Sequence, residues 1–207
     1  MHTSLITIGV VMLLAVMSPG PDFAVVTKNA LLNSRRAGYF TALGIATGTT
    51  IHVSYCIFGV ALLIMHSTFL FDAIKFLGGG YLIYIGVQSL RHLSDEVRVT
   101  VTGKSQTISN RQAFQQGLLT NLLNPKATLF FLSLFAITVN ANTSRLTQFE
   151  LAVEMIGIAF IWFCTLSTLI THRSVNQWLL RSQRTISLLM GIALIAIGLV
   201  VVIWVKR

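Results

Sequence analysis

The sequence predicts an all-α integral membrane protein, and three observations lead to that fold class. Of its 207 residues, 54% are hydrophobic and only 10% are charged, against roughly 25% charged in an ordinary soluble domain. The mean hydropathy is +0.77. Six apolar stretches, each near the ~20 residues that cross a bilayer as a helix, alternate with polar connections. We therefore expect a single transmembrane domain, embedded in a lipid bilayer, over residues 1–207.

The six predicted spans are residues 5–26, 39–65, 74–90, 114–139, 151–170 and 186–204. A cleaved signal peptide is the alternative for the first stretch. However, residues 1–4 contain no Lys or Arg, and no small-x-small cleavage site precedes the prolines. We therefore predict that the first stretch is a span.

The longest connection, residues 91–113, divides the chain into halves of residues 1–90 and 114–207, and these halves resemble each other. Three landmarks recur in the same order with slowly drifting spacing, which indicates an internal repeat. The pairs are Ser18-Pro19 with Asn124-Pro125, Ser34-Arg35 with Ser144-Arg145, and Gly79 and Gly86 with Gly191 and Gly198.

A repeat of three spans has an odd number of crossings, so its second copy enters the membrane from the opposite side. In such inverted-repeat transporters, broken helices from both halves meet near the midplane and bind substrate. The predicted fold is thus six transmembrane helices in two inverted three-helix repeats. Their first and fourth helices are broken, with Pro19 and Pro125 as equivalents.

The first break contains Pro19, Gly20 and Pro21 and ends at Asp22. Each proline removes a backbone donor and clashes with the preceding helical turn, and Gly20 is expected to supply a positive φ. Within a membrane, irregular backbone is tolerated only where it lines a cavity or is packed by protein. The break is therefore a candidate binding site.

The basic residues predict the orientation of the chain. Ten of the 15 fall in the first, third and fifth connections, which the positive-inside rule places in the cytoplasm. Both termini are then periplasmic, although Lys206 and Arg207 argue mildly against this. The ten are Lys28, Arg35, Arg36, Arg91, Arg98, Lys104, Arg111, Arg173, Arg181 and Arg184.

Two acidic residues lie within predicted spans, where a charge costs at least ~2.5–3.5 kcal/mol. Asp22 is either the N-cap of a helix that restarts at Phe23 or the counter-charge of a substrate ammonium, a proton carrier, or both. Glu154, one turn into the fifth span, either belongs to the site or extends to the membrane interface.

Lys126 is the only cation close to the second break. It either extends to the cytoplasmic surface, pairs with Asp22, or holds a substrate carboxylate together with amides at a helix N-terminus. Asn121 and Asn124 add hydrogen-bonding groups near the same helix face as Pro125.

Gly44, Gly48, His52 and Cys56 recur every fourth residue along the second span, which places them on one helix face. The glycines are expected to let another helix approach closely. His52 then lies near this contact, either as a satisfied interior histidine or with a role in proton coupling or substrate contact.

Other chemistries have less support. Cys56 and Cys164 occupy matching spans, as in a membrane thiol relay, but neither lies at a break or near another cysteine. Asp22, His52 and Glu154 lack the spacing of a metal-ligand cluster. Nucleophile motifs, phosphate loops and dinucleotide fingerprints are absent, so neither an enzyme nor a cofactor is expected. The net charge of +9 is spread over connections, so nucleic acid is not an expected partner.

Four motifs also carry a resemblance. They are Ser18-Pro19-Gly20-Pro21-Asp22; Arg35-Arg36-Ala37-Gly38 with Gly44-Ile45-Ala46-Thr47-Gly48 and His52; Gly80-Tyr81-Leu82 before Gly86; and Asn121-Leu122-Leu123-Asn124-Pro125-Lys126-Ala127 before Phe130-Phe131. Together they resemble the lysine exporter (LysE) family, in its branch of threonine and homoserine exporters, over nearly the whole chain.

The resemblance implies a bacterial inner-membrane protein that exports amino acids, with protons as the coupling ion. Many members have Pro-Gln-Phe where this chain has Leu134-Phe135-Ala136-Ile137, whereas Glu154 matches an acidic residue of threonine-exporter-like members. The expected cargo is threonine, homoserine or a related small neutral amino acid. Export of a divalent cation or another small metabolite is the alternative. The sequence allows a homo-oligomer without specifying one.

Overall fold

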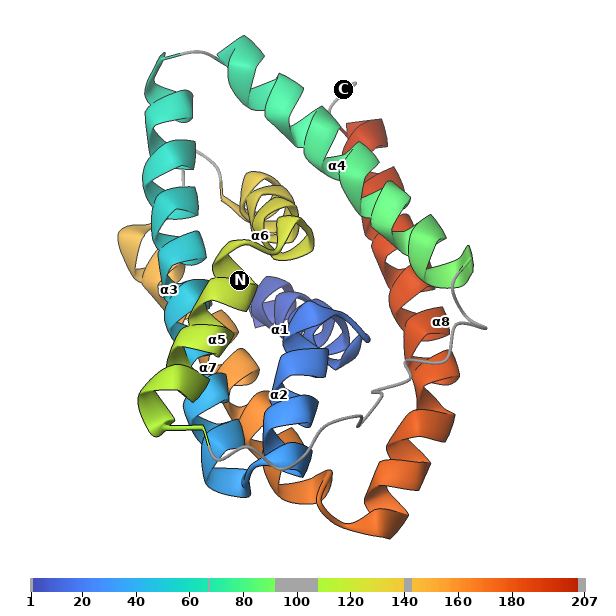
Figure 1. Ribbon diagram of the computed structural model, residues 1–207. Coiled ribbons are helices and arrows are strands. Elements are labelled where there is room, and N and C mark those ends of the chain that lie inside the picture. Colours follow the sequence, from blue (N-terminus) through green and yellow to red (C-terminus); the bar gives the residue numbers. More distant parts are fainter. Residues whose placement is uncertain (1, 67, 92–107, 140–142, 205–207) are drawn as a thin grey trace.

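The computed structural model describes residues 2–66, 68–91, 108–139 and 143–204, and within these all regular elements are helices (Figure 1). The predicted all-α class is therefore confirmed for the described chain. In order, the helices are α1 (His2–Met17), α2 (Pro21–Leu32), α3 (Arg35–His66), α4 (Thr68–Arg91), α5 (Asn110–Leu122), α6 (Pro125–Thr138), α7 (Arg145–Leu169) and α8 (Arg173–Trp204).

The prediction of membrane-spanning helices is confirmed in part. Within the described chain, α3 and α7 are long and apolar enough to cross a bilayer, and the pairs α1–α2 and α5–α6 also qualify if each is one bent span. In α8 the apolar segment found among the described residues, Arg184–Val200, is shorter. Helix α4 is not among the candidate spans of the described residues.

Both breaks occur where the prolines predict them, and they bend the chain by nearly the same angle. The axes of α1 and α2 differ by 58°, and those of α5 and α6 by 59°. Pro21 and Pro125 each occupy the first position of the helix that restarts, so the two breaks match in this respect at Pro21 and not at Pro19. A proline at this position loses no intrahelical bond.

Two details of the first break differ from prediction. Gly20 has φ −179° and ψ −176°, an extended backbone, instead of the positive φ expected of it. Helix α2 starts at Pro21 with Gly20 as N-cap and no capping side chain, so Asp22 is not the N-cap. The carboxylate is instead available to other parts of the molecule.

Helices α4 and α8 cross side by side at one edge of the molecule, α3 lies at the opposite edge, and α1, α2 and α6 lie between them (Figure 1). The crossing depends on glycines. A Cβ atom added to Gly86 would lie 2.7 Å from the carbonyl oxygen of Gly191, and one added to Gly198 would lie 2.6 Å from that of Gly79. The two backbones are therefore in direct contact, as in small-residue crossings of membrane helices.

The long helices of both halves begin with the same cap. The Ser34 hydroxyl accepts a hydrogen bond from the amide of Ala37, and the Ser144 hydroxyl accepts one from Thr147, each at 3.1 Å. A serine in this position satisfies one of the amides that a helix start leaves unpaired. The repeated Ser-Arg landmark thus has a structural meaning in both places.

Helix α5 begins at Asn110, three residues before the predicted end of the central connection. Ser109 and Gln112 form a reciprocal capping box, with bonds of 2.9 and 3.2 Å, which stabilises this start. Most of the predicted connection, residues 92–107, and the Lys206-Arg207 pair lie outside the described residues.

Candidate binding site between the broken helices

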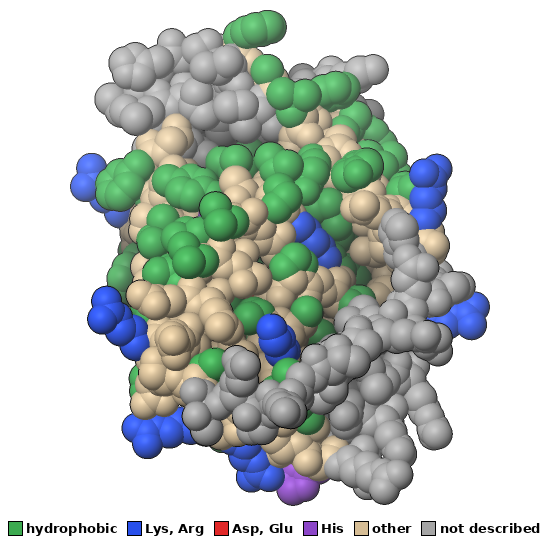
Figure 2. All heavy atoms as spheres, in the orientation of Figure 1, with side chains coloured by type: hydrophobic (Ala, Val, Ile, Leu, Met, Phe, Trp, Pro, Cys, Tyr) green, Lys and Arg blue, Asp and Glu red, His purple; other side chains and the backbone are tan. Residues whose placement is uncertain are grey.

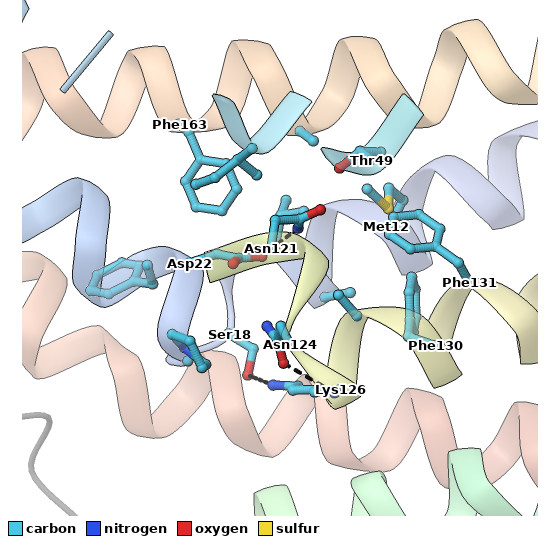
Figure 3. Close-up of a pocket in the computed structure, with 18 of the residues that line it drawn as sticks. Met12, Ser18, Asp22, Thr49, Asn121, Asn124, Lys126, Phe130, Phe131 and Phe163 are labelled. Atoms are coloured by element: carbon cyan, nitrogen blue, oxygen red, sulfur yellow. Dashed lines mark hydrogen bonds between the residues drawn. The ribbon is translucent and has the colours of Figure 1, made fainter. Parts of the chain in front are cut away.

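A cavity lies where the two breaks meet (Figure 3). It contains about 560 Å³ of space free of protein atoms, its opening included. Its polar side chains come from the segments around the breaks and from α3, and its apolar walls come from α1, α2, α3, α6, α7 and α8. The polar residues are Ser18, Asp22, Thr49, Asn121, Asn124 and Lys126.

One carboxylate oxygen of Asp22 is available to a further hydrogen-bond donor. Its Oδ2 accepts a hydrogen bond of 2.8 Å from the amide nitrogen of Asn121. Its Oδ1 is buried and has no hydrogen-bond partner among the described residues. A buried carboxylate oxygen without a donor is costly, so this atom is suited to bind an ammonium group or a proton.

Lys126 lies across the cavity, at the second position of α6, the position that Asp22 occupies in α2. Its Nζ donates a hydrogen bond of 3.1 Å to the hydroxyl of Ser18 (Figure 3). It interacts electrostatically with Asp22 but, in the described structure, forms no direct ion pair with it. The opposite charges thus face one cavity without neutralising each other by contact.

Asn124 caps the helix that carries Lys126. Its Oδ1 accepts a hydrogen bond of 3.0 Å from the backbone amide of Lys126, and Pro125 occupies the first helical position. Asn124 and Lys126 both line the cavity, so the start of α6 lies at its wall, as does the start of α2 with Pro21 and Asp22. Helix N-termini carry a partial positive charge and favour anionic groups such as carboxylates.

His52 supports the second break from behind the cavity and is not one of its lining residues. Its Nε2 bonds the carbonyl oxygen of Asn121 at 3.1 Å, its Nδ1 bonds the Tyr55 hydroxyl, and its ring stacks on Phe131. Because a carbonyl only accepts, Nε2 carries the hydrogen. Both ring nitrogens are engaged, so His52 fixes the segment that presents Asn121.

The two glycines of α3 lie against α5. Gly44 meets the carbonyl oxygen of Phe114, and Gly48 faces the side chain of Asn121, whose Oδ1 would lie 2.5 Å from an added Cβ atom. In the opposite direction, Gly117 of α5 meets the carbonyl oxygen of Thr41. Close approach of α3 and α5 therefore holds Asn121 in place beside Asp22.

Glu154 lies away from this cavity. It faces Gly9 of α1, where an added Cβ atom would lie 2.5 Å from its Oε1, and its Oε2 is buried without a hydrogen-bond partner in the described chain. The structure does not bring Glu154, His52 and Asp22 together, and no group of three potential metal ligands occurs among the described residues. The free cysteines Cys56 and Cys164 belong to separate apolar clusters.

Several lining residues were not candidates from the sequence. Ser18 was known only as part of the break, although its hydroxyl is the partner of Lys126. Thr49 follows the glycine face of α3 and had no distinguishing signal. The apolar walls come from distant parts of the chain, and no local pattern identifies them. They include Met12, Phe23, Ile45, Phe130, Phe131, Phe163 and Met190.

Figure 2 shows one face of the molecule, with hydrophobic side chains gathered over its upper half. Most basic side chains lie around the rim and towards the lower end, others lie near the middle, and no acidic side chain is visible among the described residues of this face. The lower end is where α3 begins and α7 ends (Figure 1). There Arg35 donates to the Thr171 hydroxyl at 2.8 Å, so these helix ends are held together.

Comparison with known proteins identifies the family. The LysE-type translocators match residues 13–204. An uncharacterized membrane protein of Escherichia coli, YahN, is 32% identical over 92% of this chain and 85% of its own length. YrhP, an uncharacterized membrane protein of Bacillus subtilis, is 30% identical over 96% and 98%. The threonine efflux protein of Escherichia coli is 32% identical over 79% and 80%.

No solved structure matches the chain. The family match covers nearly the whole sequence, and it is a family of transporters rather than of enzymes. This membrane protein belongs to the LysE-type translocator family.

Proposed function

We propose that this protein exports small neutral amino acids, with threonine as the first candidate, from the cytoplasm in exchange for protons. The observation that carries the proposal is the pair of opposite charges at the second positions of α2 and α6, facing one cavity. An amino acid carries the complementary charges on its ammonium and carboxylate. A relative that is 32% identical is named for threonine efflux.

In the proposed complex, Asp22 Oδ1 binds the substrate ammonium, because this buried atom has no partner within the described chain. The Lys126 ammonium holds the carboxylate, and the dipole at the start of α6 adds to the charge of the lysine. His52 and the α3–α5 contact position Asn121, which in turn orients Asp22.

Exchange follows because a proton and the substrate ammonium compete for the same atom, Asp22 Oδ1. When the amino acid leaves on the periplasmic side, a proton takes its place on Asp22, and the neutral carboxyl returns to the cytoplasmic side. An empty, charged carboxylate is expensive to move through a low-dielectric environment. The proton therefore enters as the amino acid leaves.

Two inverted repeats of three spans provide the proposed alternating access. Three features support this architecture: the equal bends at the two breaks, the matching serine caps, and the α4–α8 crossing. In that crossing, Gly86 meets Gly191 and Gly79 meets Gly198. If Gly79 corresponds to Gly191 and Gly86 to Gly198, a two-fold axis converts the contact between Gly86 and Gly191 into the contact between Gly198 and Gly79.

The proposed location is the bacterial inner membrane, with both termini periplasmic. The starts of α3 and α5 and the end of α7 lie at one end of the molecule, where Arg35 contacts Thr171 and Arg36 lies beside Asn110. Exposed arginines at this end, including Arg111, suit a cytoplasmic surface.

The cavity walls favour a small uncharged side chain. Beyond the two charged residues, the walls consist mainly of Phe, Met, Ile and Ala side chains, which offer no counter-charge for an acidic or basic amino acid. A bare divalent cation would require several oxygen or nitrogen ligands around it. Lys126 in the same cavity opposes such a cation by charge.

A transport panel tests the proposed function. Proteoliposomes that contain the purified protein are loaded with labelled threonine, homoserine, valine, lysine, glutamate or Mn²⁺, and efflux is measured against protein-free vesicles. We expect efflux of the small neutral amino acids at least tenfold above that of lysine and glutamate, accelerated by a lower pH outside. Efflux of Mn²⁺ alone, or of no amino acid, would refute the proposal.

A further inference from the structure

The hydroxyl of Thr49 is an exception among the hydroxyl side chains of α3. Thr41, Thr47 and Thr50 each donate to the carbonyl oxygen four residues earlier, at 2.9 Å. Ser54 does the same at 2.7 Å. The Thr49 hydroxyl forms no hydrogen bond with any described residue, although Thr49 is only 1% exposed and lines the cavity.

Thr49 therefore offers the cavity a free hydroxyl. Two hydroxyl side chains line the described cavity, and the other, Ser18, already accepts from Lys126. The back-bond to the preceding turn that its neighbours use is not formed, so the hydroxyl is available to a ligand in the cavity. A ligand with its own hydroxyl would satisfy it.

We propose that Thr49 recognises a hydroxyl on the side chain of the transported amino acid, so that the site prefers a β-hydroxy amino acid to its apolar isostere. The inference rests on the proposed function and names the feature of the cargo that the cavity selects. The ammonium and carboxylate are bound by Asp22 and Lys126, and Thr49 adds the specificity for the side chain.

The position of Thr49 relative to Asp22 fits this role. Asn121 connects the two regions, because its Nδ2 donates to Asp22 and its side chain lies against Gly48, the neighbour of Thr49 (Figure 3). One amide side chain therefore spans the distance from the carboxylate to this turn of α3. In a β-hydroxy amino acid, the hydroxyl oxygen lies three bonds from the ammonium nitrogen, so one ligand presents both groups close together.

Threonine and valine give a direct test, because they differ by a hydroxyl in place of a methyl group. Initial efflux rates of both amino acids are measured in proteoliposomes for the wild type, Thr49→Val, Thr49→Ser and Thr50→Val. Thr50 is the matched control, since it is adjacent and its hydroxyl is bonded within its own helix. Rates are normalised to the amount of folded protein in the vesicles.

We expect Thr49→Val to lower the threonine-to-valine rate ratio roughly tenfold, the effect of one hydrogen bond with a buried partner. Thr49→Ser keeps the hydroxyl and should preserve the preference, as should Thr50→Val. An unchanged ratio in Thr49→Val, or the same loss in Thr50→Val, would overturn the assignment. If the wild type transports neither amino acid, the proposed function fails instead, so the two failures are distinct.

Discussion

Replacing Asp22 with Asn is expected to lower threonine export roughly 100-fold. Asn has nearly the same size and retains an oxygen that can accept from Asn121, so the local structure should persist. It lacks the negative charge that binds the ammonium, and it cannot carry a proton. Loss of one charge-assisted hydrogen bond costs up to about 3 kcal/mol, which corresponds to this change in rate.

The measurement is the initial rate of labelled threonine efflux from proteoliposomes, with equal amounts of folded wild-type and variant protein. Glu150→Gln is the matched control, because it removes a carboxylate of α7 that does not line the cavity. We expect this control to transport like the wild type. Export by Asp22→Asn within twofold of the wild type would contradict the proposed role of the carboxylate.

Replacing Gly44 with Ala, which adds one methyl group, is expected to lower the free energy of unfolding by roughly 1–3 kcal/mol. The added Cβ atom would overlap the carbonyl oxygen of Phe114 and lie 2.7 Å from the amide nitrogen of Leu118. Both atoms belong to the backbone of α5, so no side chain can move to relieve the clash. The helices must separate, which also displaces Asn121 from Asp22.

Gly59→Ala is the matched control in the same helix, since an added Cβ atom there meets no atom within 4 Å. Without a clash, Ala in a helix is favoured over Gly by about 0.5–1 kcal/mol, so the two variants should differ in sign. Thermal unfolding of the purified proteins in detergent measures this, with a lower midpoint for Gly44→Ala and an equal or higher one for Gly59→Ala. Equal midpoints in both variants would show that the α3–α5 contact is looser than described.

The sequence alone predicted where the first and fourth helices break, because a run of proline and glycine cannot continue a helix. It could not decide which proline restarts the helix, since Pro19 and Pro21 are both acceptable at a first helical position. For the same reason it left open whether Asp22 is the N-cap of the restarted helix. Packing decided the outcome, with Gly20 extended and Asp22 turned towards Asn121.

The polar part of the site was largely predictable, and the apolar part was not. Asp22 and Lys126 are candidates because charges in membrane spans are costly, and Asn121 and Asn124 because they add hydrogen-bonding groups at the second break; all four line the cavity. Glu154 satisfied the same criterion but faces α1 elsewhere, because depth in the membrane does not specify which neighbour a side chain meets. The apolar walls are defined only by the three-dimensional arrangement of six helices.

The sequence also contains a pattern that predicts the start of α5. Ser109 and Gln112, three residues apart at the end of a polar connection, have the pattern of a capping box, and it marks the true start of α5. Thr49 could not be singled out from the sequence. Its hydroxyl differs from those of Thr41 and Thr50 only in lacking a hydrogen bond to the preceding turn, and this difference is visible only in the structure.

The assignment of the two charges to the two ends of an amino acid is tested most directly by inhibition of labelled threonine transport. The inhibitors are unlabelled threonine, N-acetylthreonine, which lacks the ammonium, and threonine methyl ester, which lacks the carboxylate. For the wild type we predict inhibition by threonine at least tenfold stronger than by either analogue. In Asp22→Asn, N-acetylthreonine should inhibit as strongly as threonine does. In Lys126→Gln, threonine methyl ester should inhibit as strongly as threonine does. Equal inhibition of the wild type by all three compounds would contradict the account.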